Sequence, residues 1–360
     1  MMNAITRCVT KAAAGIALAL SATTVVNAST QPVPPLNLDT DTITVSGLSS
    51  GGYMANQFHM AYSDWVKGAG IIAAGPYYCG QNDITTALSQ CVNKMDSPVN
   101  LDTLSAKAKD WAQRGKIAPL ENLKDSKVWL LHGTADTRVM SDVSDLLHTQ
   151  YTMLVPETQV TYVNDKPFAH VFPTLDNGGS CTTSESPFIG ACEYDAAGEM
   201  LNFMYDSLTA PDDTLSGNVY SFRQAELAGD NAKTLGELGF VYVPKNCEAG
   251  SDGSDGANAS AGENTNGNAC QVHVSFHGCN QYADAVDDAY VTGTGLNRWA
   301  DDNSMVVIYP QTKKSMFMPL NPQGCWDWWG YTSEDYATRD GQQIQAVKSM
   351  IEGLSGKGIE

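Results

Sequence analysis

The sequence predicts an α/β fold in which helices cover both faces of a mostly parallel sheet. Short, almost wholly apolar stretches such as 127–131 and 305–309 have the length and composition of strands buried on both sides. Helical stretches such as 142–152 separate them, and this alternation is typical of parallel strands joined by helical crossovers. In chain order we expect strands at 42–46, 70–75, 127–131, 158–163, 238–243, 272–276 and 305–309, with helices at 52–62, 100–120, 142–152 and 295–300.

Each element has a local signal of its own. The strand at 42–46 is rich in β-branched residues, and the one at 70–75 is a continuous apolar run. The helix at 100–120 mixes charged and apolar residues, as a surface helix does. Val, Phe and Tyr dominate the later strands, which predicts that they extend the same sheet.

The composition is that of a globular protein with an excess of acidic groups. Hydrophobic residues make up 42% and charged residues 17% of the 360 residues, which excludes general disorder. The net charge of −19 argues against nucleic acid, because such binding depends on cationic contacts to phosphate. It argues equally against docking on an anionic membrane surface, so we expect neither partner.

The N-terminus has the features of a secretory signal peptide. Arg7 and Lys11 precede an apolar run at 12–22, and Val26 and Ala28 place small residues before a cleavage point. The run is too short for a membrane anchor, which needs about 20 residues. We therefore expect a signal peptide at 1–28, a mature chain of residues 29–360 and export to the extracellular space or periplasm.

The cysteines support export. Cys8 leaves with the signal peptide, and the eight that remain suggest disulfides in an oxidising compartment. Eight cysteines allow 105 connectivities, so the sequence does not settle the pairing. Short loops favour three pairs and leave a fourth: Cys79–Cys91, Cys181–Cys192, Cys247–Cys270 and Cys279–Cys325.

Residues 249–268 form a low-complexity segment of Gly, Ser, Asp, Asn and Ala. Such a segment can be a linker between two domains. Cys247 and Cys270 flank it, however, and the strands on either side have the character of neighbours in one sheet. We therefore interpret it as a surface loop within a single catalytic domain.

Gly47-Leu48-Ser49-Ser50-Gly51 fits G-x-S-x-G between a predicted strand and a predicted helix. In this context the motif forms a sharp turn that raises the serine hydroxyl above the carboxyl edge of the sheet. The sequence thus predicts a nucleophile at Ser49. The backbone N–H of the next residue, Ser50, can stabilise an oxyanion.

A serine nucleophile needs a base and an acid that orients it, in the chain order Ser, acid, His. Asp136 follows the strand at 127–131 and is the predicted acid; Asp142, which begins a helix, is the fallback. Among six histidines, His170 follows the strand at 158–163 by a short loop and is the predicted base.

His277-Gly278-Cys279 follows the strand at 272–276. In α/β-hydrolases a turn of this kind supplies the second oxyanion N–H, but it normally precedes the nucleophile. A circular permutation of the α/β-hydrolase fold explains the reversed order, since domain termini often lie close together. A second, non-catalytic domain is the alternative.

Three tryptophans, Trp326, Trp328 and Trp329, follow Cys325 in a segment that begins at Asn321. They are either packed in the core or the wall of a substrate cleft for apolar chains or sugar faces. A Cys279–Cys325 disulfide would join this segment to the predicted oxyanion loop.

These motifs together resemble extracellular poly(3-hydroxybutyrate) depolymerases, most closely the circularly permuted, single-domain type first known from a fungus. The segments that match are 47–55, 169–174, 277–280 and 325–331. The resemblance implies an α/β-hydrolase that needs no metal or organic cofactor. It also implies a Ser49–Asp136–His170 triad, oxyanion N–H groups on Ser50 and Cys279, and a subsite lined by Trp326 and Asn321.

The resulting hypothesis is a secreted, monomeric serine esterase that cleaves a polyester or oligoester through an acyl-enzyme. A feruloyl or acetylxylan esterase is the alternative enzyme, because a polysaccharide cleft also uses Trp. A polymer- or sugar-binding protein with a dead site is the alternative outside the enzymes. The order of Ser49, Asp136 and His170 argues against that last alternative.

Overall fold

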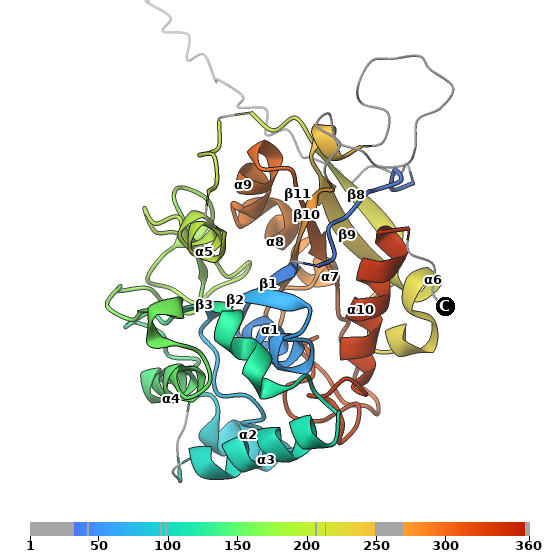
Figure 1. Ribbon diagram of the computed structural model, residues 1–360. Helices are drawn as coiled ribbons and strands as arrows, with labels where there is room; N and C mark the ends of the chain where they lie inside the picture. The colour runs from blue at the N-terminus through green and yellow to red at the C-terminus, as the bar shows by residue number, and fades with distance from the viewer. Residues whose placement is uncertain are drawn as a thin grey trace, which may run out of the picture.

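The computed structural model describes residues 32–41, 43–93, 96–97, 99–205, 207–212, 214–248 and 269–356 (Figure 1). The predicted signal peptide at 1–28 and the predicted surface loop at 249–268 lie outside these residues. Among the described residues, no helix has both the length and the apolar character needed to cross a membrane.

The described part of the chain folds around one eight-stranded sheet. Six neighbouring strands are parallel, and β9 runs antiparallel to both β11 and β8. In spatial order the strands are β4 (Val160–Val163), β3 (Lys127–Leu131), β2 (Val66–Ile72), β1 (Ile43–Leu48), β10 (Gln271–Phe276), β11 (Met305–Tyr309), β9 (Leu238–Val243) and β8 (Asn218–Arg223).

The strand order is that of a circularly permuted α/β-hydrolase. β1 ends at the predicted nucleophile and pairs with β10, although β10 follows it only in the last third of the chain. The strands that precede the nucleophile in an ordinary hydrolase therefore follow it here, as the sequence predicted. The carboxyl ends of β1, β3 and β10 lie at the same edge, because the strands between β4 and β11 are parallel.

Helices cover both faces of the sheet (Figure 1). On one face pack α1 (Ser50–Ala61), α3 (Leu101–Gln113), α4 (Ser141–Thr152) and α10 (Gln342–Leu354). On the other pack α5 (Ala196–Met204), α8 (Ala289–Gly293) and α9 (Leu296–Asp302). The remaining α-helices are α2 (Ile84–Gln90), α6 (Gln224–Ala228) and α7 (Ala283–Val286), and short 3-10 helices cover Leu120–Asp125, Glu157–Gln159, Gly229–Ala232 and Lys245–Cys247.

Alternate residues of each strand supply two separate cores. In β3, Val128 and Leu130 face the α1 side, whereas Trp129 and Leu131 face the α5 side. This is the period of two that a strand imposes, and it explains why β3 is apolar after Lys127.

A second, three-stranded sheet lies beside the predicted base. It joins β5 (Phe172–Thr174), β7 (Ile189–Ala191) and β6 (Gly179–Ser180). These strands have only two or three residues each, too few for a hydrophobic pattern to predict them from the sequence. The elements β8, α5 and α10 were not predicted either.

Four disulfides join the eight cysteines of the described residues. Their pairing is the one that loop length favoured: Cys79–Cys91, Cys181–Cys192, Cys247–Cys270 and Cys279–Cys325. The last bridge spans 46 residues and connects the turn after β10 to the tryptophan-rich segment.

Candidate active site

Ser49 lies in the sharp turn between β1 and α1. Its φ of 58° and ψ of −122° belong to a region that residues with a side chain rarely adopt, at a cost of about 1–3 kcal/mol. Neighbouring backbone atoms pack so closely against the two glycines of the motif that neither position has room for a side chain. A Cβ on Gly51 would lie 2.0 Å from the carbonyl oxygen of Phe276, and one on Gly47 would lie 2.2 Å from that of Gly51. Both glycines of the motif are therefore required by this geometry.

His170 and Asp136 form a close pair. His170 Nδ1 lies 2.7 Å from Asp136 Oδ2, and both side chains are buried. The other carboxylate oxygen accepts hydrogen bonds from the N–H groups of Arg138, at 2.7 Å, and Val139, at 3.0 Å. Burial alone would raise the pKa of Asp136, but the bond and charge of His170 and these N–H groups hold it below its usual value.

Two backbone N–H groups meet beside Ser49. Ser50 N is the first amide of α1, and Cys279 N lies in the turn after β10. Within the described residues, neither amide donates to a protein acceptor. Both residues line the same pocket as Ser49, so the two amides are available to an oxygen bound there.

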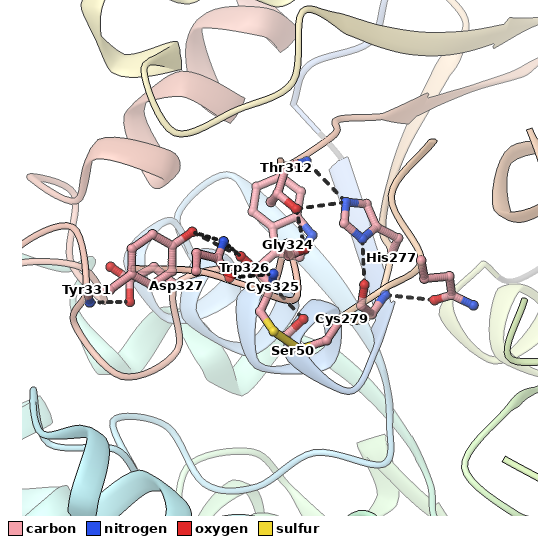
Figure 2. The surroundings of a disulfide bond; sticks show 12 residues. Ser50, His277, Cys279, Thr312, Gly324, Cys325, Trp326, Asp327 and Tyr331 are labelled. Atoms are coloured by element: carbon pink, nitrogen blue, oxygen red, sulfur yellow. Dashed lines mark hydrogen bonds between the residues drawn. A yellow bond between two sulfur atoms is a disulfide. The ribbon is translucent and has the colours of Figure 1, made fainter. Parts of the chain in front are cut away.

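The turn at 277–281 is fixed by side chains on either side of Cys279. Gly278 N donates to Gln281 Oε1 at 2.7 Å, and Gln281 Nε2 donates to Pro187 O at 2.8 Å. His277 accepts from Thr312 N through Nε2, so its Nδ1 bears the proton and donates to Gly278 O at 2.7 Å (Figure 2). Burial lowers the pKa of His277 to about 4, which keeps this ring neutral.

These groups open onto a pocket of about 800 Å³. Ser49, Ser50, His170 and Cys279 line its base. The walls come from five segments of the chain and are mainly apolar or aromatic: Tyr53, Ile84, Leu88, Val92, Val139, Phe188, Met318, Leu320, Trp328, Trp329 and Tyr331. Tyr53, which the sequence analysis did not single out, stacks on Trp328 with ring centroids 5.0 Å apart.

Of the three predicted tryptophans, Trp328 and Trp329 line the pocket and Trp326 does not. The expectation for Trp326 is corrected, because its side chain is fully buried against Phe276 and His277.

Asn321 lines the pocket, but its amide is used within the segment. Asn321 Oδ1 accepts from Cys325 N at 2.9 Å, and Nδ2 donates to Cys325 O at 2.9 Å and Tyr331 Oη at 3.1 Å. The residue thus shapes the wall.

The other histidines and Asp142 have structural roles in the described part of the chain. The five other histidines are buried or packed on aromatic rings: His59, His132, His148, His273 and His277. Asp142 lies in the first turn of α4, where an acidic side chain favours the helix. Among the described residues, no group of three or more His, Cys, Asp or Glu side chains is placed to hold a metal ion.

Two proteins of known name are similar to the chain over most of its length. It is 39% identical over 349 residues to a poly(3-hydroxybutyrate) depolymerase of Delftia acidovorans, which covers 96% of this chain and 65% of that protein. It is 35% identical over 341 residues to a polyhydroxybutyrate depolymerase of Talaromyces funiculosus, which covers 90% of this chain and 94% of that protein. No protein-family model matches the chain.

Solved structures give the same result. The crystal structure of a PHB depolymerase from Penicillium funiculosum superposes with a TM-score of 0.79 at 34% identity, over 91% of this chain and 100% of that one. A serine-to-alanine variant of a PHB depolymerase, complexed with an R3HB trimer, matches with the same TM-score at 33% identity and the same coverage. The chain spans about two thirds, 65%, of the Delftia protein and nearly all of the fungal one. By fold and by sequence, the chain belongs to the poly(3-hydroxybutyrate) depolymerase family.

Proposed function

We propose that the chain is a serine esterase that hydrolyses poly(3-hydroxybutyrate) or its oligomers through an acyl-enzyme. One observation supports this most strongly: the elbow serine, two unpaired N–H groups and His170, which is paired with Asp136, all line one largely apolar pocket. The names of its relatives, and the R3HB trimer bound by one of them, indicate the class of ester.

The chemistry follows from the roles that the geometry allows. His170 takes the proton of Ser49, whose oxygen attacks the ester carbonyl carbon. The carbonyl oxygen becomes an oxyanion held by Ser50 N–H and Cys279 N–H. The ester C–O bond breaks, and His170 passes the proton to the departing alcohol. Water, deprotonated by His170, then attacks the acyl-enzyme, which releases the acid and restores Ser49.

Asp136 orients His170 and stabilises the positive charge that the ring acquires. Its lowered pKa keeps it ionised for that purpose. No hydrogen bond joins Ser49 to His170 among the described residues; in free enzymes this bond often forms only when substrate binds.

Exposed apolar side chains at the rim of the pocket are consistent with a water-insoluble substrate. A short hairpin closed by Ser315 and Asn321 exposes Met316, Phe317, Met318 and Leu320, and Phe317 is 84% exposed. Ile84 and Leu88, on α2, are also exposed and line the same pocket. Apolar patches of this kind are unusual unless they bind something.

We also propose that the chain is exported after removal of residues 1–28 and acts as a monomer. The four disulfides of the described residues support export, because such bonds persist in oxidising compartments.

The test is product analysis with wild-type protein and Ser49→Ala. Wild type should clear a poly(3-hydroxybutyrate) film and release 3-hydroxybutyrate oligomers, whereas Ser49→Ala should stay folded and lose at least about 10⁴-fold in rate. Acetylated xylan and feruloyl esters belong in the same assay. Preference for either of these would favour the polysaccharide esterase, and near wild-type activity of Ser49→Ala would rule out the assigned nucleophile.

A further inference from the structure

Asp327 is a fully buried carboxylate that the catalytic steps do not use. It lies between Trp326 and Trp328, and its residue is 1% exposed. It does not line the pocket, and no described Lys, Arg or His pairs with it. A buried charge without a counter-ion is costly, so the groups that surround it must compensate.

The compensation comes from the backbone of the aromatic segment. Oδ1 accepts from Gly330 N at 2.7 Å, Tyr331 N at 2.9 Å and Trp329 N at 3.3 Å. Oδ2 accepts from Thr332 N at 2.8 Å and from Thr332 Oγ1 at 2.6 Å. Figure 2 shows Asp327 beside Tyr331. Four successive N–H groups therefore converge on one carboxylate, which bends residues 329–332 around it.

The backbone of Asp327 connects this bend to the helix that begins at the nucleophile. Gln57, on α1, donates to Asp327 O at 2.9 Å. Asp327 N donates to Gln343 Oε1 at 2.8 Å on α10, and Gln343 Nε2 donates to Tyr331 Oη at 2.8 Å. Asp327 thus holds the segment at a set position relative to α1.

The residues that this bend presents are Trp328, Trp329 and Tyr331, which we call the aromatic wall. All three line the pocket. Burial raises the pKa of Asp327 although its hydrogen bonds lower it, so ionising this carboxyl costs more than it does in water. A neutral apolar residue would avoid that cost but would leave four N–H groups without an acceptor.

We propose that Asp327 is a positioning residue that sets the substrate range of the pocket, by holding the aromatic wall where it contacts the ester units beyond the scissile bond. The proposal depends on the pocket being the esterase site described above. A short ester, which reaches only Ser49, His170 and the two N–H groups, does not need the wall. An oligoester does, because contacts remote from the reacting bond contribute to its binding.

The experiment compares the methyl ester of a 3-hydroxybutyrate trimer with p-nitrophenyl acetate, using steady-state kinetics. For Asp327→Ala we expect KM for the trimer to rise at least about tenfold, while kcat/KM for p-nitrophenyl acetate changes less than about threefold. Near-ultraviolet circular dichroism should change as Trp328 and Trp329 lose their fixed environment, and the thermal midpoint shows whether the variant is folded.

Two milder variants keep the proposal testable if Asp327→Ala does not fold. Asp327→Asn retains Oδ1 for three N–H groups but places an amide nitrogen against Thr332 N, so its rise in KM should be intermediate. Thr332→Val removes only the bond from Oγ1 and should give the smallest rise. Asp195→Ala is the matched control, because Asp195 accepts from Gly198 N and Trp299 Nε1 on the opposite face of the sheet. It should lower the thermal midpoint without changing the KM for the trimer.

Unchanged KM for the trimer in the folded Asp327 variants would overturn the proposal, as would equal losses on both esters. Failure of the proposed function has a different result, because wild type itself would then not hydrolyse the 3-hydroxybutyrate trimer.

Discussion

Two loops of the molecule each place a buried carboxylate behind the pocket, and the surroundings shift the pKa of the two carboxylates in opposite directions. Asp136, after β3, accepts from an imidazole and two N–H groups, and its pKa is lowered. Asp327, in the tryptophan-rich segment, accepts only from N–H and hydroxyl groups, and its pKa is raised. Both are buried, so burial alone does not explain the difference.

The difference lies in the partner. A histidine beside Asp136 can take up a proton, and the resulting charge pair favours the ionised acid. Asp327 has no such partner among the described residues, so its hydrogen bonds determine local shape. We infer that Asp136 assists proton transfer by His170, whereas Asp327 fixes the position of the aromatic wall.

The largest expected effect is the loss of activity when Asp136 is replaced, which tests its role in proton transfer. Asp136→Asn should lower kcat for p-nitrophenyl butyrate by about 10⁴-fold, because an amide no longer holds His170 in the required tautomer. The thermal midpoint should change little. Asp142→Asn is the control and should retain activity within about twofold. If Asp142→Asn loses as much as Asp136→Asn, the acid has been assigned to the wrong residue.

The next effect tests the connection between the oxyanion loop and the aromatic segment. The double variant Cys279→Ser/Cys325→Ser should lose about 10²-fold in kcat, because one oxyanion donor is no longer held in place. It should also lose about 4 kcal/mol of unfolding free energy, because the bridge joins residues 46 positions apart and so restricts the unfolded chain.

The matched variant Cys247→Ser/Cys270→Ser removes a bridge that spans 23 residues and does not line the pocket. It should lose about 3 kcal/mol in urea unfolding and keep its kcat. Equal kcat for the two double variants would show that the oxyanion loop does not depend on its bridge.

A third prediction concerns three buried histidines that stay neutral. Burial lowers the pKa of His59 and His273 to about 3, and that of His277 to about 4. Between these values and about 6.5, the unfolded chain binds protons that the folded chain does not. The contribution of these neutral histidines to the free energy of unfolding is therefore complete above about pH 6.5, and it declines as the pH falls towards 4.

The decline should be about 3 kcal/mol for each of these histidines at the low end of that range. Urea unfolding at pH 7 and pH 4.5 measures it. The variant His273→Asn should show a smaller decline than wild type, since one buried imidazole has been removed. An identical pH dependence would contradict the assignment of His273 as a neutral core residue.

The smallest expected effect is at the rim. Phe317 is 84% exposed and packs on little, so Phe317→Ser should change unfolding free energy by less than about 0.5 kcal/mol. Hydrolysis of a soluble trimer should be unchanged, and clearing of a polymer film should slow. Unchanged clearing would show that the hairpin does not contact the polymer surface.

Elements with a complete local signal were predicted well. The strands at 127–131 and 305–309 have the observed bounds, because each consists largely or wholly of a short apolar run. The strand expected at 70–75 instead covers Val66–Ile72. Lys67 interrupts its apolar pattern, yet the Nζ of Lys67 reaches the carbonyl oxygens of Ser63 and Asp64 while the backbone remains in the sheet. Tertiary pairing overrode the local pattern there.

The sequence by itself determined the features that depend on near neighbours. These are the elbow at Ser49, the placement of Asp136 and His170 after predicted strands, and the preference for disulfide pairs with short loops. Each follows from a turn, a strand end or a short loop whose chemistry is contained in a few adjacent residues.

Tertiary structure alone decided which members of the tryptophan-rich segment face the pocket. Trp326 is fully buried whereas Trp328 and Trp329 line the cavity, although the three are equivalent as side chains. That choice depends on Gln57 from α1, Gln343 from α10 and the carboxylate of Asp327, which meet only in the folded chain. A buried acid can be recognised as a structural one only when its partners are known, because its own sequence position does not reveal them.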